Sequence, residues 1–337
     1  MPANLIDALA LPARALAWLG RQGTRAVAAL VVIAIAVPTL GEWLRPYVTE
    51  AIFLLLCVSF MRVDFGALRD QLRRPRIILA ATAWTMAAVP ATIGIGYVAT
   101  GLDKSSPELF LGIMLQAVAS PMMASPALAT LMGLDATLVL ITLVTGSALV
   151  PLTAPLFAYF FLGGTLALSP LTLGIKLVLI LAGSLCVAGL IRASVGAAAI
   201  HRHKDPIDGA NILILLVFVS AVMGSFAASF WHAPLRVAGL ALLAFAIYFA
   251  LLGLTMVVFQ RLGPERALAL GLMVSQRNMG LMIAATDGFL PGLTWLYFAL
   301  SQFPIYLSPQ LLKPIAARVT NHPRAPLGAA AELPKPD

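Results

Sequence analysis

One arginine stands in the middle of a long apolar stretch of the chain. Arg277 is the eleventh residue of the apolar segment 267–286 and belongs to the sequence MVSQRNMGL at 273–281. If this segment spans a bilayer, its guanidinium lies near the midplane, where insertion costs about 2.5 to 3.5 kcal/mol. Ionisable groups at that depth usually face a cavity or a partner. A guanidinium there favours anion binding, because its planar fork forms paired hydrogen bonds with a carboxylate or sulfate.

The composition is that of a polytopic membrane protein. Of 337 residues, 61% are hydrophobic and 11% are charged, whereas about 25% are charged in soluble domains. The net charge of +8 is therefore attributed to basic loops beside the lipid bilayer, and we expect no nucleic-acid partner. Cys57 and Cys186 both lie in apolar segments, which predicts two buried thiols rather than a disulfide.

Ten segments are long and apolar enough to cross a bilayer, which takes about 20 such residues. The predicted spans are 26–44, 47–61, 77–99, 109–132, 136–160, 171–191, 211–230, 235–259, 267–286 and 292–315. Basic residues give the orientation, because 17 of the 22 Lys and Arg residues fall on the side that holds both termini. We therefore predict cytoplasmic termini and a bacterial inner membrane. The most basic connection, 62–76, is expected to anchor at the lipid headgroups.

The spans divide into two sets of five, at 26–160 and 171–315. An odd number in each set places the second set upside down in the membrane, an arrangement found in many secondary transporters. We therefore expect an all-α fold of two inverted five-helix repeats. The cytoplasmic segment 1–25 is either a short interfacial helix or a plain extension, and we expect the tail 316–337 to be disordered.

The fourth and ninth spans occupy corresponding places, and both are interrupted. Pro121 and Pro126 near the middle of the fourth span predict a kink or an unwound stretch. The ninth span is interrupted by SQRN and the glycine that follows it. Polar groups gather at the two breaks, although each one can instead satisfy a local carbonyl or a neighbouring helix. The predicted substrate-binding residues are Arg277, Asn278, Gln276, Ser275, Ser125, Pro126, Pro121 and Thr130.

No acidic residue lies in the middle of a predicted span. The charge of Arg277 must therefore be balanced by backbone carbonyls at the breaks, by water, or by an anionic substrate. A structural alternative is that Arg277 binds carbonyls exposed at the break of the fourth span and holds the crossing in shape.

Three segments resemble the bile acid:sodium symporter superfamily: MRVDFGALRDQLRRPR at 61–76, SPMMASPALATLMGLD at 120–135 and SQRNMGL at 275–281. The resemblance covers nearly the whole chain in order, spacing and topology. It implies a secondary transporter with a core domain, in which broken spans four and nine cross, and a panel domain of spans one, two, six and seven. The implied substrates are organic anions such as bile acids and small carboxylates, often carried with sodium.

Two departures from the family pattern fall on its sodium ligands. Where sodium-coupled members read Glu-x-Gly-x-Gln-Asn-x-Gly, this chain has Met273 at the glutamate and Arg277 at the glutamine, whereas Asn278 matches. Ser125 and Pro126 stand where these members have Ser-Asn. Sodium needs oxygen ligands, but Met273 offers a thioether and Arg277 brings a positive charge.

These features predict a secondary active transporter of an organic anion, bile-acid-like or a small carboxylate, that works by alternating access. Transport needs no sodium if Arg277 supplies the charge that bound sodium supplies in relatives. The alternatives are a sodium-coupled symporter with a rebuilt ion site that uses hydroxyls such as those of Thr142 and Thr145, a non-transporting anion sensor, and a passive channel. We expect no enzyme, since HExxH, GxSxG and paired midplane carboxylates are absent from the sequence, and we predict no cofactor or metal site.

Overall fold

The computed structural model describes residues 3–62, 75–224 and 226–320, which are helical throughout apart from connecting turns. Most of the predicted anchor at 62–76 and residues 321–337 of the predicted tail lie outside these ranges. Residues 316–319, which the sequence predicted to be disordered, instead continue the last helix, Gly292–Val319. Six helical segments of the described part are long and apolar enough to cross a membrane. They are Pro38–Met61, Pro75–Ala99, Ala136–Thr165, Pro170–Val195, Lys204–Met223 and Pro234–Val258.

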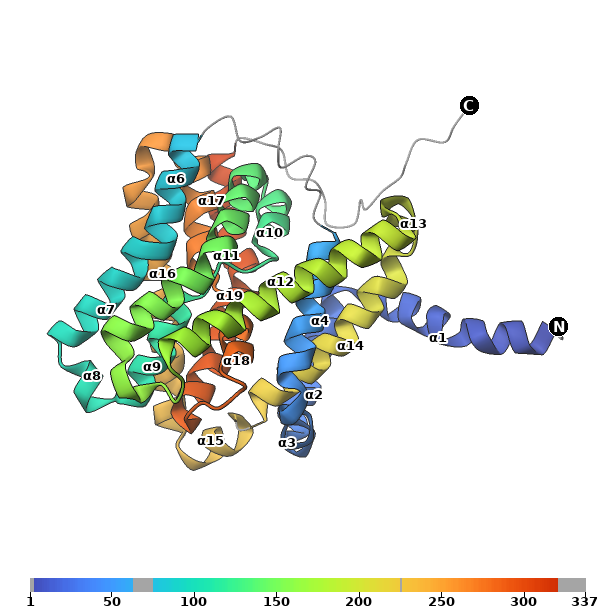
Figure 1. The fold of residues 1–337 in the computed structure, drawn as a ribbon, viewed down its shortest axis with the longest axis horizontal. Helices are drawn as coiled ribbons and strands as arrows, with labels where there is room; N and C mark the ends of the chain where they lie inside the picture. The colour runs from blue at the N-terminus through green and yellow to red at the C-terminus, as the bar shows by residue number, and fades with distance from the viewer. Residues whose placement is uncertain (1–2, 63–74, 225, 321–337) are drawn as a thin grey trace.

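The helices pack as two groups (Figure 1). The first group contains α1 (Ala3–Gln22), α2 (Thr24–Ala36), α3 (Pro38–Leu44), α4 (Val48–Met61) and α14 (Lys204–Met223). The second group contains α6 (Pro75–Ala83), α7 (Val89–Ala99), α9 (Pro107–Val118), α10 (Ser125–Leu131), α11 (Ala136–Phe157), α16 (Pro234–Val258), α17 (Pro264–Ser275), α18 (Met279–Ala285) and α19 (Gly292–Val319). Helix α12 (Pro170–Val195) runs across the molecule and contacts α4 of the first group and α11 of the second.

Short helices connect these elements. They are α8 (Leu102–Ser105), α13 (Ala197–Arg202) and α15 (Phe226–His232), with the single turns η1 (Arg45–Tyr47), η3 (Ala158–Leu162), η4 (Gly163–Thr165) and η5 (Gln260–Leu262). A further turn, η2 (Trp84–Ala88), joins α6 to α7 and is wider than an ordinary α-helical turn.

Local sequence explains where several helices begin. The Asp135 carboxylate accepts a hydrogen bond from the Leu138 N–H at 3.0 Å and caps α11. The Asn278 side chain does the same for the Leu281 N–H at 3.2 Å and caps α18. Each cap satisfies one of the backbone donors that a helix start leaves free. Helices α9, α16 and α17 instead begin with proline, which lacks a donor and is preset for the first turn.

The predicted interruptions of the fourth and ninth spans are confirmed. Helix α9 ends at Val118 and α10 begins at Ser125, while α17 ends at Ser275 and α18 begins at Met279. The two prolines of the fourth span play different parts, however. Pro121 lies in the break, whereas Pro126 occupies the first turn of α10 and does not kink it.

The predicted start of the seventh span at residue 211 is wrong, because α14 begins at Lys204. The first turns of α14 are polar, and they pack against α1. Contact there is so close that a Cβ on Gly209 would lie 1.9 Å from the Leu16 carbonyl oxygen. The close packing of the α14 backbone against α1 therefore keeps residues 204–210 helical, although they are too polar for an apolar span.

Candidate functional site

The two helix breaks lie side by side and are joined through their backbones. The Met122 N–H donates to the Gln276 carbonyl at 2.9 Å, and the Asn278 N–H donates to the Ser120 carbonyl at 2.8 Å. These bonds pair Pro121 with Arg277 as a short antiparallel bridge. Backbone groups inside a membrane must find partners within the protein. Each break therefore supplies hydrogen-bond partners for backbone groups of the other, and these two bonds hold the crossing together at its centre.

The Arg277 side chain is enclosed at this crossing, with only 1% of its surface exposed. Its Nε donates to the Val274 carbonyl at 2.8 Å, and Nη1 donates to the Ala119 carbonyl at 3.0 Å. Both Nη1 and Nη2 donate to the Thr85 carbonyl, each at 3.2 Å. Three backbone oxygens from three parts of the chain therefore surround the guanidinium.

Unwinding of the helices makes two of these oxygens available. In a continuous helix the Val274 carbonyl would accept from the N–H of Asn278, but that N–H bonds to Ser120 instead. The Ala119 carbonyl follows the last residue of α9, where the chain turns to an extended conformation. Arg277 therefore takes up acceptors that the breaks have released.

In the part of the chain that the structure describes, no acid pairs with Arg277. Ion pairs among the described residues include Arg21–Asp205, Arg62–Asp208, Lys176–Asp287 and Arg266–Asp135, and Arg277 takes part in none of these four. Binding to carbonyls is the arrangement that the structural alternative for Arg277 predicts. A guanidinium has five N–H donors, and the four hydrogen bonds of Arg277 leave one hydrogen on Nη2.

A cavity of about 300 Å³ borders the crossing between α4, α14 and α19. Arg277 and Asn278 line it, and Arg277 is the one charged residue among the described residues of its wall. The other side chains that bring polar atoms to the wall are Ser59, Asn211, Gln302 and Tyr306. The rest of the wall is apolar, with methionine, leucine, isoleucine and phenylalanine side chains. The arrangement suits a ligand that has one negative group and an otherwise apolar body.

Two of the remaining predicted site residues belong to a buried chain of hydrogen bonds. Ser125 Oγ donates to Gln276 Oε1 at 2.9 Å, and Gln276 Nε2 donates to Ser308 Oγ at 3.0 Å. Ser308 Oγ in turn donates to the Ile305 carbonyl at 2.7 Å. The chain ties both breaks to α19 and does not line the cavity, so it stabilises the crossing.

The last four predicted residues also lie outside the cavity wall. Ser275 Oγ donates to the carbonyl of Gly271 at 2.8 Å, and exposed Thr130 donates to the carbonyl of Pro126 at 3.0 Å. Both hydroxyls therefore satisfy a carbonyl of their own helix, which is the alternative to substrate binding that the sequence allowed. Pro121 forms the bridge to Arg277, and Pro126 begins α10.

Sequence reasoning missed the cavity residues contributed by α4, α14 and α19. Asn211 is an amide at the start of an apolar run, NILILLVFV, which is the kind of signal that could have identified it. Gln302 and Tyr306 lie four residues apart and therefore on one face of α19. Ser59 carries no comparable signal, because serine is common in membrane helices.

The hydroxyls considered for a rebuilt sodium site are already engaged. Thr142 donates to the Leu138 carbonyl at 2.8 Å, and Thr145 donates to the Ile141 carbonyl at 3.0 Å. Thr145 and Thr82 hydroxyls also lie 2.8 Å apart. Within the described ranges no three His, Cys, Asp or Glu side chains gather as metal ligands. Arg277 thus binds the carbonyl oxygens that the breaks release, and its positive charge disfavours a sodium ion beside them.

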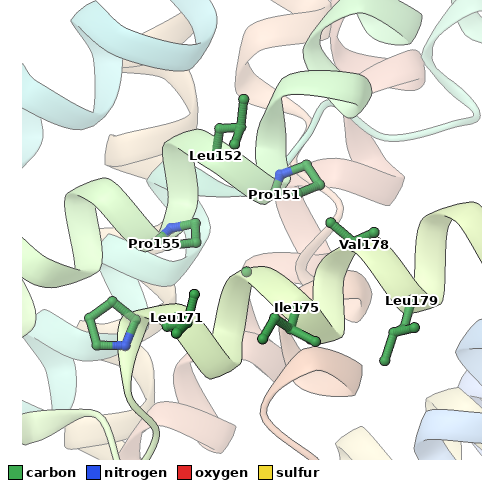
Figure 2. Close-up of a pocket in the computed structure, with 9 residues that line it drawn as sticks. Pro151, Leu152, Pro155, Leu171, Ile175, Val178 and Leu179 are labelled. Carbon is green, nitrogen blue, oxygen red and sulfur yellow. The ribbon is translucent and has the colours of Figure 1, made fainter.

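A second and larger hollow, about 420 Å³, lies between α11 and α12 (Figure 2). All nine residues that line it are proline, glycine or aliphatic. Figure 2 shows Leu152 on α11 and Leu171 and Leu179 on α12 at this hollow, and each of the three side chains is at least 65% exposed. Such a surface suits contact with lipid chains and offers nothing to a charged ligand.

No protein-family model and no curated protein sequence matches the chain. The resemblance to the bile acid:sodium symporter superfamily stays a prediction.

Proposed function

We propose that the protein is a secondary active transporter that carries an organic anion across a membrane by alternating access. The observation that carries the proposal is the buried guanidinium of Arg277, which pairs with no acid of the described residues and belongs to a residue that lines a cavity where two broken helices cross. A charge at this depth is costly and usually marks a substrate pathway. Paired breaks at a crossing are also where inverted-repeat transporters bind their substrates.

The proposed architecture is ten spans in two inverted repeats. Its support is that the breaks lie in the fourth and ninth predicted spans, which correspond under such an inversion. In this view α2 to α4, α12 and α14 form the panel, and the remaining long helices form the core that contains the crossing. The basic residues favour cytoplasmic termini in a bacterial inner membrane.

The cavity favours a monovalent substrate. Its wall holds one formal charge, that of Arg277, and is otherwise neutral and largely apolar. A single carboxylate or sulfonate would be balanced by this charge, whereas a second one would be buried without a partner. Burying an unpaired charge costs several kcal/mol. The preferred substrate class is therefore a monoanion with an apolar body.

Transport is proposed to be independent of sodium. A bound sodium ion would have to occupy oxygens that Arg277 already uses, and the like charges would repel each other. The sodium-coupled alternative would use hydroxyl oxygens such as those of Thr142 and Thr145, which donate within their own helix and keep lone pairs, but it would place a second positive charge near Arg277. The fixed guanidinium supplies the positive charge instead.

Anion binding is tested with three probes that share a benzene ring and differ in charge. Benzenesulfonate should raise the melting temperature of the purified protein in a saturable way, equally in sodium and choline chloride. Neutral benzenesulfonamide should have no effect, and benzenedisulfonate should bind at least tenfold more weakly. Equal stabilisation by the sulfonamide, or none by benzenesulfonate, benzoate and cholate, would contradict anion binding. Binding without uptake into proteoliposomes would favour the sensor.

Two contacts at one end of the molecule support alternating access. Lys176 on α12 forms an ion pair with Asp287, which follows α18. The guanidinium of Arg45, after α3, lies 4.7 Å from the ring centroid of Trp295 on α19. Both contacts join the proposed panel to the proposed core, at the end of α4 opposite to Ser59 in the cavity wall. In the proposed transport cycle these contacts close the side of the protein that faces away from the cytoplasm. The structure would then represent the conformation whose cavity faces the cytoplasm.

Breaking the ion pair should therefore favour the outward-open form. In a Cys57→Ala, Cys186→Ala background carrying Met123→Cys in the cavity wall, Lys176→Gln should increase labelling by an impermeant thiol reagent from outside. The increase should be two- to fivefold, because an exposed ion pair contributes up to about 1 kcal/mol. Lys104→Gln, on short helix α8, is the control. Equal labelling in the two variants would contradict a closing role for Lys176.

A further inference from the structure

The long helix formed by α6, η2 and α7 contains a backbone carbonyl without a helical partner. In the wide turn η2 the Val89 N–H bonds to the Trp84 carbonyl, five residues back rather than four. The next backbone position that could donate to the Thr85 carbonyl is residue 90, which is proline and has no N–H. The shifted turn and the proline together leave the Thr85 oxygen free.

The free oxygen is the one that Arg277 binds twice. Both Nη1 and Nη2 donate to the Thr85 carbonyl, each at 3.2 Å, across 192 positions of sequence. Thr85 is fully buried and Arg277 is 1% exposed, so water does not serve either group. A carbonyl left unpaired inside a membrane costs several kcal/mol. Wide turns of this kind are often found at functional sites, and here the turn supplies the third oxygen around the guanidinium.

We propose that Pro90 is a positioning residue of the anion site. By withholding an N–H it keeps the Thr85 carbonyl available to Arg277, and this fixes the guanidinium of a residue that lines the cavity. The carbonyls of Ala119 and Val274 are released at the crossing itself. The carbonyl of Thr85 is instead released by Pro90, in a helix that takes no part in the two breaks. The inference rests on the proposed function, because it assigns Pro90 to the binding of an anion by Arg277.

The test introduces a donor at position 90 and then removes it. Pro90→Ala brings an N–H that can bond to the Thr85 carbonyl in competition with Arg277. We expect the Kd for benzenesulfonate to rise about tenfold, while the melting temperature of the ligand-free protein stays the same or increases. Lactic acid at position 90, introduced as a backbone ester, has the alanine side chain but no N–H. It should return the Kd to within twofold of the wild type.

A matched control separates the donor from helix straightening. Pro314→Ala replaces an exposed proline inside α19 and should leave the Kd unchanged. Wild-type affinity in Pro90→Ala, or equal weakening in the alanine and ester variants, would overturn the role of Pro90 and leave the proposed function standing. A wild-type protein that binds no benzenesulfonate, benzoate or cholate would overturn both.

Discussion

Replacing Arg277 with glutamine should remove anion binding. The variant keeps a side chain that can donate to carbonyls, but it loses the one charge in the cavity wall. Removing one partner of a buried charge pair typically costs 2 to 5 kcal/mol, which is about 30-fold or more in affinity. The Kd of Arg277→Gln for benzenesulfonate, measured by calorimetry, should therefore rise at least about 30-fold.

Stability should fall in the same variant, because three carbonyls lose charged donors. An unmet buried polar group costs about 1 to 3 kcal/mol. Arg277→Lys separates the two effects, since it keeps the charge and loses the planar fork. It should bind the anion within about tenfold of the wild type although its melting temperature also falls. Arg261→Gln, at an exposed turn, should change neither quantity. Equal loss of affinity in the lysine and glutamine variants would show that geometry rather than charge governs binding.

Replacing Gln276 with leucine should cause the largest loss of stability among neutral substitutions at the crossing. Gln276 accepts from Ser125 and donates to Ser308, so the substitution leaves two buried hydroxyls with one partner fewer. Ser308 Oγ keeps its bond to the Ile305 carbonyl, so the cost is that of the Ser125 hydroxyl, about 1 to 3 kcal/mol for one unmet group. A fall in melting temperature of several degrees should appear in a detergent thermal-shift measurement.

The matched control is Gln260→Leu, an exposed glutamine in turn η5. It should leave the melting temperature within about one degree of the wild type, because surface changes are usually within about 0.5 kcal/mol. Benzenesulfonate affinity of folded Gln276→Leu should stay near the wild-type value, since Gln276 does not line the cavity. A variant that melts normally but loses affinity would place Gln276 in the binding site after all.

The crossing could be predicted from sequence because its elements carry local signals. Pro121 interrupts an apolar run, and the polar SQRN interrupts another, so both breaks were visible without any tertiary information. The sequence placed Arg277 in the middle of an apolar segment, and the structure buries its side chain. The sequence also predicted that no acid pairs with Arg277, because no Asp or Glu lies in the middle of a predicted span.

The partners of Arg277 could not be predicted from the sequence. They are backbone carbonyls, which every residue carries, so no residue type marks them. Thr85 is 192 positions away from Arg277, and its side chain donates to its own helix at the Ala81 carbonyl. Pro90 was the available signal, since a proline inside a span always leaves an acceptor unmet. The polar neighbours of Arg277 were interpreted as one site, but tertiary packing divides them between the cavity wall and the interior of the crossing.

The start of α14 is a part of the fold that hydropathy alone does not predict. Hydropathy predicts the part of a helix that lies in lipid, and residues 204–210 are too polar for that. They are helical because α1 packs against them at the distance that Gly209 permits. Contact between distant segments outweighs local composition here.

The central claim is that a fixed guanidinium replaces a coupling cation in the transport of a monoanion. Its most direct test is the initial rate of benzenesulfonate uptake into proteoliposomes, with external sodium replaced by choline, for the wild type and for Arg277→Gln. We predict saturable wild-type uptake at equal rates in the two salts, and no uptake above empty liposomes for Arg277→Gln. A strict requirement for sodium, or uptake by Arg277→Gln at the wild-type rate, would contradict the claim.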